Sequence, residues 1–259
     1  MPVLRVRTEF ELQDVVEALD QPADLVARDF ALMTIAARLT EIYPGELCFK
    51  GGFVLRHVHG HQRFSRDIDA TRTQPPKHKL DAQSVAQEIS RASGTLMTFK
   101  PAPPETDSSR SLDFNRIAFS GPFAEGLVSV EISYREDVHD PQVERIGPPY
   151  YEPFPITVLS LDEIVAEKLR ALCQRTRATD LADIAMVLRR NEHDPAHIRE
   201  LAAEKFKLVR DGDHRERVTR RVEQMGTEYQ ADVQAVAPDA PDYEAAASIL
   251  ARALNDLLP

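Results

Sequence analysis

The 259-residue chain is poor in cysteine and contains no long hydrophobic run. Its two cysteines, Cys48 and Cys173, are too few for a disulfide framework, and each lies among apolar residues. We therefore expect buried free thiols and a cytoplasmic protein, because the cytoplasm keeps thiols reduced. The first 20 residues have no apolar core behind a basic start, so they do not resemble a signal peptide. No segment approaches the roughly 18 apolar residues of a membrane-spanning helix.

Positive charge is also in deficit, because the formal net charge is -10 at pH 7. Proteins that coat nucleic acid without specificity are basic, so the composition disfavours that class. The Lys and Arg residues are nevertheless concentrated in two basic segments, Lys50–Lys79 and Lys168–Arg190. The first holds seven of them against two acids, and the second holds six against two acids. The two basic segments indicate either a local site for an anionic ligand or solvated helix faces.

The spacing of apolar residues predicts a chain in two parts. In the first part we predict helices at 23–42, 53–58 and 80–94, and strands at 47–49, 67–71, 96–100, 115–120 and 127–134. A polar loop is predicted over 101–113, and a connector rich in proline over 141–155. In the second part, a capping-box pattern at Ser160 and Glu163 opens a helix through Leu172. Further helices are predicted at 180–190, 195–209, 213–229 and 242–258.

These elements predict an α+β fold with a mixed or antiparallel sheet and flanking helices, followed by a helical domain. We place the boundary near residue 155. Residues 1–155 then form the domain that carries the sheet, and residues 156–259 form the helical domain.

Two carboxylates stand one residue apart in a predicted strand, at Asp67 and Asp69. Residues i and i+2 of a strand point to the same face, so the two side chains project together with Ile68 packed behind. Like charges this close repel, and a divalent cation such as Mg²⁺ relieves the repulsion. A solvated pair of aspartates on an exposed strand is the alternative, and the pair alone favours it.

Two further features favour the metal site. Glu131 alternates with apolar residues, so it becomes a third carboxylate on the same surface if its strand pairs beside the aspartate strand. Three acids can bind two metal ions, as phosphoryl and nucleotidyl transfer often require. Gly51 and Gly52 precede a predicted helix, where glycines let a phosphate approach the backbone N–H groups. A tight turn is the alternative interpretation of the glycine pair.

Together, Gly51-Gly52, a helix, Ser65-x-Asp67-x-Asp69 and a later Glu131 resemble the nucleotidyltransferase fold of the DNA polymerase beta type. Residues 167–184 are similar to the K-L-x-A-L…R…R-D-L-x-D segment of the AbiEii-like nucleotidyltransferases, the toxin family that includes the MenT enzymes. The resemblance spans roughly residues 25–190. Thr179 stands where the family has an arginine.

The resemblance implies roles for particular residues. The implied catalytic residues are Asp67, Asp69, Glu131, Lys168 and Asp183. The implied nucleotide-binding residues are Gly51, Gly52, Ser65, Lys168, Arg175 and Asp180. Metal binding is implied for Asp67, Asp69 and Glu131. Asp180 and Asp183 could position Lys168 or Arg175 by ion pairing, help to bind the acceptor, or only stabilise the helices.

The resemblance also implies an activity. It is the Mg²⁺-dependent transfer of a nucleotide from an NTP to an RNA acceptor, with two metal sites and release of pyrophosphate. The expected acceptor is the 3′ end of tRNA, so that modification blocks translation, and a cognate antitoxin is the expected partner. The helical domain is expected to complete the active-site cleft. Two alternatives stay open, namely a small-molecule nucleotidyltransferase of the antibiotic-modifying kind and a non-catalytic regulatory module with a transferase fold.

Overall fold

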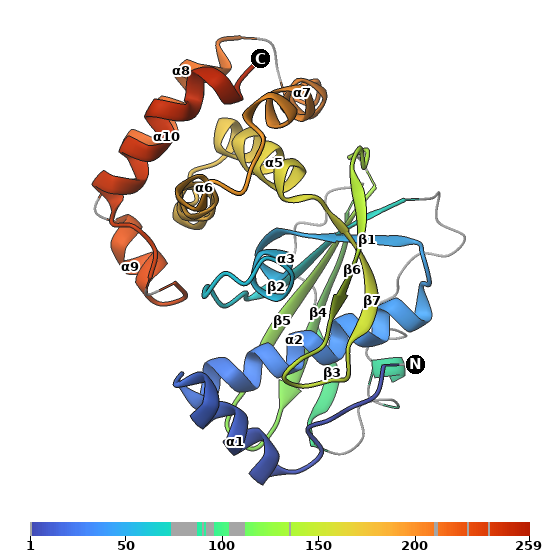
Figure 1. Ribbon diagram of the computed structural model, residues 1–259. Coiled ribbons are helices and arrows are strands. Elements are labelled where there is room, and N and C mark those ends of the chain that lie inside the picture. The colour runs from blue at the N-terminus through green and yellow to red at the C-terminus, as the bar shows by residue number, and fades with distance from the viewer. Residues whose placement is uncertain are drawn as a thin grey trace. The chain divides into compact units, whose positions relative to one another are not determined.

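The computed structural model describes residues 2–73, 87–89, 91, 96–103, 112–134, 136–209, 212–226, 228–237 and 239–259. The chain forms two compact units (Figure 1). The first contains Met1–Gly60 and Phe64–Val158, and the second contains His61–Arg63 and Leu159–Pro259. In these stretches we find no helix that is long and apolar enough to cross a membrane.

The first unit is built on one seven-stranded mixed sheet, in the order β3-β4-β5-β2-β1-β7-β6. Its strands are β1 (Leu47–Lys50), β2 (Asp67–Arg72), β3 (Thr98–Ala102), β4 (Leu112–Ser120), β5 (Glu125–Ser133), β6 (Pro141–Ile146) and β7 (Phe154–Leu159). Strand β2 runs parallel to β5 and antiparallel to β1, whereas β5 runs antiparallel to β4. The predicted α+β fold with a mixed sheet is therefore confirmed.

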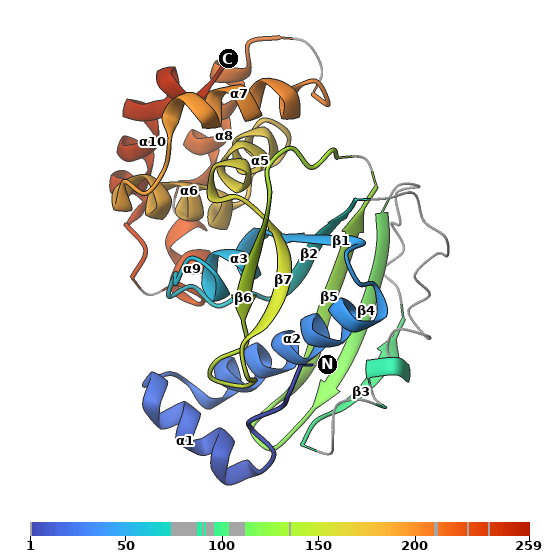
Figure 2. The same cartoon turned by 45° about the vertical axis from the view of Figure 1, so that its right-hand side comes forward.

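Three described helices belong to this unit, namely α1 (Glu9–Leu19), α2 (Ala23–Ile42) and α3 (Gly51–His57). Helices α1 and α2 lie on one face of the sheet (Figures 1 and 2). The strands alternate accordingly, because Val128, Val130 and Ile132 of β5 are fully buried while Ser129 and Glu131 are partly exposed. The same alternation on β2 buries Ile68 and leaves the residues on either side partly exposed. The sheet therefore presents a polar face opposite its apolar one.

Several predictions for this unit were wrong or incomplete. The proline-rich connector contains β6 and β7. Proline is tolerated at the first position of a strand and at a sheet edge, which accounts for Pro141 in β6. Helix α1 was not predicted. The predicted loop is strand at Pro101, Ala102, Leu112 and Asp113, while residues 104–111 lie outside the described residues. Of the predicted helix 80–94, only residues 87–89 and 91 are described as helical.

The second unit is helical, as predicted. It contains α5 (Leu161–Gln174), α6 (Ala178–Arg190), α7 (Pro195–Phe206), α8 (His214–Met225), α9 (Glu228–Gln234) and α10 (Tyr243–Leu257). The single helix predicted over 213–229 is two, because Gly226 interrupts it with φ of 38°.

Helix α5 carries Lys168 and is held by its first turn. The Ser160 hydroxyl accepts a hydrogen bond from the Glu163 N–H at 3.1 Å, as the capping pattern predicts. The Glu163 carboxylate lies 2.6 Å from the ammonium of Lys205 on α7, which also contacts Glu167 at 3.2 Å. All three of these charges are buried, so the ion pairs join α5 to α7 inside the core.

Candidate active site

Carboxylates gather on the polar face of the sheet where β2 and β5 lie side by side. In the parallel register of these strands, Asp69 is opposite Glu131 and Asp67 is opposite Ser129. Residues opposite each other in paired strands point to the same face. The structure therefore confirms that the strand of Glu131 pairs beside the aspartate strand and places a third carboxylate on its surface.

Gly51 lies directly against Asp69. A Cβ atom at Gly51 would stand 2.5 Å from Oδ2 of Asp69, and the φ of Gly51 is +71°. Both observations exclude other side chains, since L-residues rarely adopt this φ and no real Cβ approaches an oxygen so closely. The second glycine, Gly52, is buried within α3, which begins at Gly51 rather than after the glycine pair. Gly51 thus lets the start of α3 contact the carboxylate.

Two neighbouring polar residues have partners within the first unit. Lys50 lies opposite Asp69 in the antiparallel register of β1 and β2, and its ammonium forms an ion pair with Glu136. The Ser65 hydroxyl donates a hydrogen bond to the Asp67 carbonyl at 2.9 Å and so shapes the turn that enters β2. Glu136 has no sequence signal that would have identified it as the partner of Lys50.

The remaining predicted residues form a charged cluster in the second unit, in which Lys168, Asp180 and Asp183 are buried and Arg175 is half exposed. Nζ of Lys168 on α5 lies 2.7 Å from Oδ2 of Asp183 and 3.1 Å from Oδ1 of Asp180, both on α6. A guanidinium nitrogen of Arg175 lies 2.9 Å from Oδ2 of Asp180. On the other side, Nε of Arg63 lies 3.1 Å from Oδ1 of Asp183. Arg63 lies two residues before Ser65, and no sequence pattern assigns it a role.

Lys168 and Asp180 keep their charges despite being buried. Burial opposes a charge on Lys168, but Asp183 and Asp180 outweigh that effect and raise the pKa of Lys168 above its ordinary value. Burial likewise opposes a charge on Asp180, but Lys168 and Arg175 hold the pKa of Asp180 below its ordinary value. Lys168 is therefore a fixed ammonium and Asp180 a fixed carboxylate at neutral pH.

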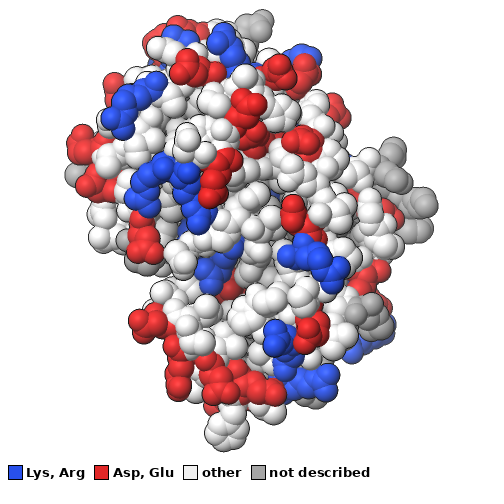
Figure 3. Space-filling view, in the orientation of Figure 1, with Lys and Arg blue, Asp and Glu red and all other residues white. Residues whose placement is uncertain are grey.

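The first basic segment, Lys50–Lys79, was interpreted as either a site for an anionic ligand or a solvated helix face. Neither interpretation fits those of its cations that are buried. Several of its cations are inside ion pairs rather than on a surface: Arg56 with Asp29, Arg63 with Asp183, Arg72 with Glu46, and Lys50 with Glu136. The face of the molecule in Figure 3 shows basic and acidic side chains interspersed. The clustering of these cations in the sequence therefore reflects internal charge pairing.

The donor set on the sheet fits a hard divalent cation. Asp67, Asp69 and Glu131 offer carboxylate oxygens, the ligands that Mg²⁺ prefers. Among the side chains that the structure describes, no three His, Cys, Asp or Glu already stand close enough together to enclose an ion. Mg²⁺ is commonly bound by one or two carboxylates together with substrate phosphates, so the residues present suit a metal that arrives with the nucleotide.

Comparison with known proteins identifies the family. The model of the nucleotidyl transferase AbiEii toxin family, of the type IV toxin–antitoxin system, matches residues 36–252. A search of curated proteins found no match. Among solved structures, JHP933 from Helicobacter pylori is similar with a TM-score of 0.56 and 18% identity, over 97% of this chain and 94% of that one.

A second similar structure is MenT4, a nucleotidyltransferase toxin from Mycobacterium tuberculosis, with a TM-score of 0.55 and 18% identity. The similarity covers 96% of this chain and 99% of MenT4. At this identity the two structures show a shared fold, whereas the family match covers most of the chain. The chain belongs to the AbiEii family of nucleotidyltransferase toxins, and it is a nucleotidyltransferase of a toxin–antitoxin system.

Proposed function

We propose that the protein transfers a nucleotide from an NTP to the 3′ end of an RNA, with tRNA as the acceptor, and so blocks translation. The observation that carries the proposal is the register of β2 and β5, which aligns Asp69 with Glu131 beside Asp67 on one polar face. Carboxylates in such a group are the common requirement of nucleotidyl transfer with metal ions. The toxin family supports the class of reaction and implies a cognate antitoxin and an NTP substrate.

The carboxylates would act through Mg²⁺. Asp67 and Asp69 would hold one ion together with the triphosphate, and Glu131 would complete a second site or accept the proton of the attacking hydroxyl. Bound Mg²⁺ supplies charge stabilisation for the α-phosphate and the leaving pyrophosphate. Gly51 keeps Asp69 in place, because only a residue without Cβ leaves room for the Asp69 carboxylate.

The second unit would contribute fixed positive charge. Lys168 would neutralise the triphosphate, and its two carboxylate partners would hold its side chain in one position. Arg175 reaches the same network through Asp180, and its side chain is half exposed, so it can also approach a phosphate. Asp180 and Asp183 act in this account by positioning Lys168.

The test is transfer of label. The purified protein is incubated with Mg²⁺, each α-labelled NTP in turn and total tRNA, and the products are separated from free nucleotide. The expected result is label on RNA with at least one NTP, lost in Asp67→Ala and kept in Asp14→Ala, which changes an exposed aspartate of α1. Label on a small molecule would favour an antibiotic-type transferase instead. Failure to bind any NTP would favour a regulatory module.

A further inference from the structure

The polar face of the sheet continues beyond the carboxylates onto β3, β4 and β5. The register places Asp67, Ser129 and Arg116 in one row across β2, β5 and β4. The next row along β5 contains Leu127, Ala118 and Lys100, and the row after it contains Glu125, Ser120 and Thr98. Paired residues share a face, so all three rows lie on the side that carries Asp67 and Asp69.

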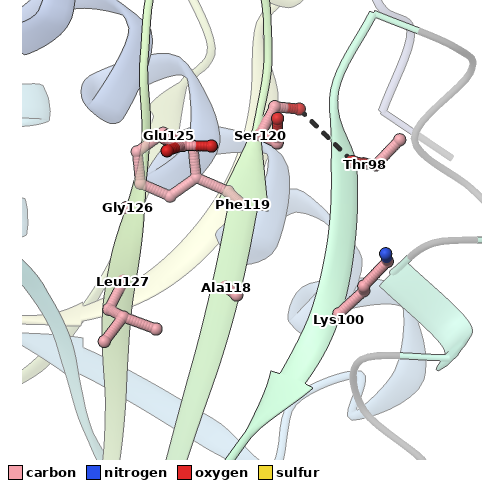
Figure 4. Close-up of a pocket in the computed structure, with 8 residues that line it drawn as sticks. All are labelled: Thr98, Lys100, Ala118, Phe119, Ser120, Glu125, Gly126 and Leu127. Atoms are coloured by element: carbon pink, nitrogen blue, oxygen red, sulfur yellow. Dashed lines mark hydrogen bonds between the residues drawn. The ribbon is translucent and has the colours of Figure 1, made fainter.

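The last two rows enclose an open hollow of about 400 Å³ (Figure 4). Lys100 and Leu127 are exposed on its two sides, and Leu127 is 42% exposed although it is a large apolar residue. Thr98 and Ser120 line its far part, where the Thr98 hydroxyl donates to the Ser120 carbonyl at 3.4 Å. The volume is at the lower end of the roughly 300–1,000 Å³ of ligand pockets.

The chemistry along these rows changes in an ordered way. Asp69 and Glu131 form the first row, Asp67 shares the next row with the cation Arg116, and Lys100 follows beside the apolar Leu127. Strand residues rise about 3.3 Å each, so successive rows are about 7 Å apart and the row of Leu127 is about 13 Å from that of Glu131. Positive charges at such intervals can contact successive phosphates of a single nucleic-acid strand. An apolar surface between them can contact a base or a sugar.

We propose that this face of β3–β5 binds the single-stranded end of the RNA acceptor that leads to the carboxylates. The inference rests on the proposed function and adds to it the path of the acceptor. Lys100 and Arg116 contact phosphates, and Leu127 with Ala118 supports the nucleotide between them. Glu125 places a negative charge at the far end of the hollow and limits how far the strand follows this face. The protein contacts the phosphates of the RNA backbone and one face of a nucleotide, so these contacts do not depend on the RNA sequence.

The experiment compares Lys100→Glu and Leu127→Asp with two matched variants. Lys207→Glu reverses an exposed lysine of the second unit, and Val143→Asp replaces an exposed apolar residue on β6 of the same sheet. Thermal unfolding confirms that each variant is folded. Two quantities are then measured, namely KM for total tRNA in the labelling reaction and the affinity for the labelled NTP without RNA.

The expected result is that KM for tRNA rises about fivefold to tenfold in Lys100→Glu, while the affinity for the NTP changes by less than about twofold. Leu127→Asp behaves in the same way, and the two matched variants leave both quantities unchanged. Glu125→Gln lowers KM for tRNA by about twofold, because it removes a charge that repels phosphate. KM for tRNA should rise in Lys100→Glu and fall in Glu125→Gln. A general loss of structure would raise it in both variants.

The inference is overturned if wild-type protein labels tRNA and neither Lys100→Glu nor Leu127→Asp changes KM for tRNA. It is also overturned if both variants weaken binding of the NTP as much as binding of tRNA. If wild-type protein labels no RNA with any NTP, the proposed function fails and this inference fails with it. The two failures are distinguishable, because failure of the proposed function is seen with wild-type protein, whereas failure of this inference alone is seen only in the variants.

Discussion

Nζ of Lys168 lies 2.7 Å from Oδ2 of Asp183, and the Asp183 side chain is fully buried. Because Asp180 contacts the same ammonium, one lysine joins two carboxylates, and Arg63 and Arg175 each contact one of them from outside the pair. A buried charge that loses its partner is costly, whereas a buried pair removed together often is not. The same lysine is thus central to the stability of the helical unit, and in the proposed function it also supplies the charge that faces the triphosphate.

We predict that Lys168→Met lowers the free energy of unfolding by about 3 kcal/mol, because it removes the cation that two buried carboxylates share and leaves each with a single arginine. Adding Asp180→Asn to this variant restores part of the stability, since one of those charges is then gone and its other partner, Arg175, is half exposed. Transfer activity should stay lost in both proteins. Chemical denaturation and the labelling assay measure the two effects separately, and additive losses of stability would contradict the pairing.

Gly51→Ala should reduce activity far more than it reduces stability. The positive φ costs alanine about 1–2 kcal/mol, and the added Cβ must also displace the Asp69 carboxylate. Misplacing a catalytic group by about 1 Å can cost about 10²-fold in rate, and we expect a loss of that order. Gly60→Ala is the matched control, because Gly60 has a φ of +65° with nothing within 4 Å of the added Cβ. Equal activity in the two variants would show that Asp69 does not depend on Gly51.

Asp29 joins three elements of the first unit and should be critical for its stability. Its buried carboxylate contacts Nε of Arg56 at 2.9 Å and Nε2 of His57 at 3.1 Å, and it accepts a hydrogen bond from the Tyr150 hydroxyl at 2.9 Å. Asp29→Ala should lower the free energy of unfolding by about 3–5 kcal/mol, since Arg56 loses its buried partner. Tyr150→Phe removes one hydrogen bond to a charged group and should cost about 1.5–3 kcal/mol. A smaller loss in Asp29→Ala than in Tyr150→Phe would contradict this arrangement.

Acid should weaken the second unit through Asp180. Lys168 and Arg175 hold its pKa below the ordinary 3.8, so its contribution to stability is complete above that value. The contribution is lost as pH falls through the lower folded-state pKa, because protonation then breaks the ion pairs. The stability difference between wild type and Asp180→Asn should therefore shrink as pH is lowered below about 4. Denaturation curves at pH 3 to 7 measure it, with the exposed Asp232→Asn as control, and a constant difference would contradict the assignment.

The local part of the site was predictable from the sequence. Alternation of two residues places Asp67 and Asp69 on one face, and the same period places Glu131 opposite its apolar neighbours. The parallel pairing of β2 with β5 could not be predicted, because strand register depends on contacts between residues far apart in the chain. The α+β fold and the helical second half followed from apolar spacing, and the roles of the individual residues remain predictions.

Other features could not be predicted because their causes are not local. Strands β6 and β7 lie in a proline-rich stretch, where composition indicates a connector. Pro141 begins the edge strand β6, a position that tolerates proline, whereas Pro155 lies in β7 between β1 and β6. Arg56 and Arg72 looked like parts of a basic segment, but their partners Asp29 and Glu46 are 27 and 26 residues away. Burial of a charge depends on such partners, and a count of nearby charges does not detect them.

The most direct test measures two products of one reaction, namely pyrophosphate released and nucleotide joined to RNA 3′ ends. Wild-type protein, Mg²⁺, the NTP that gives label and tRNA should yield the two in equal amounts, and Asp69→Asn should yield neither while staying folded. Pyrophosphate without joined nucleotide, or label that persists in Asp69→Asn, would contradict the account.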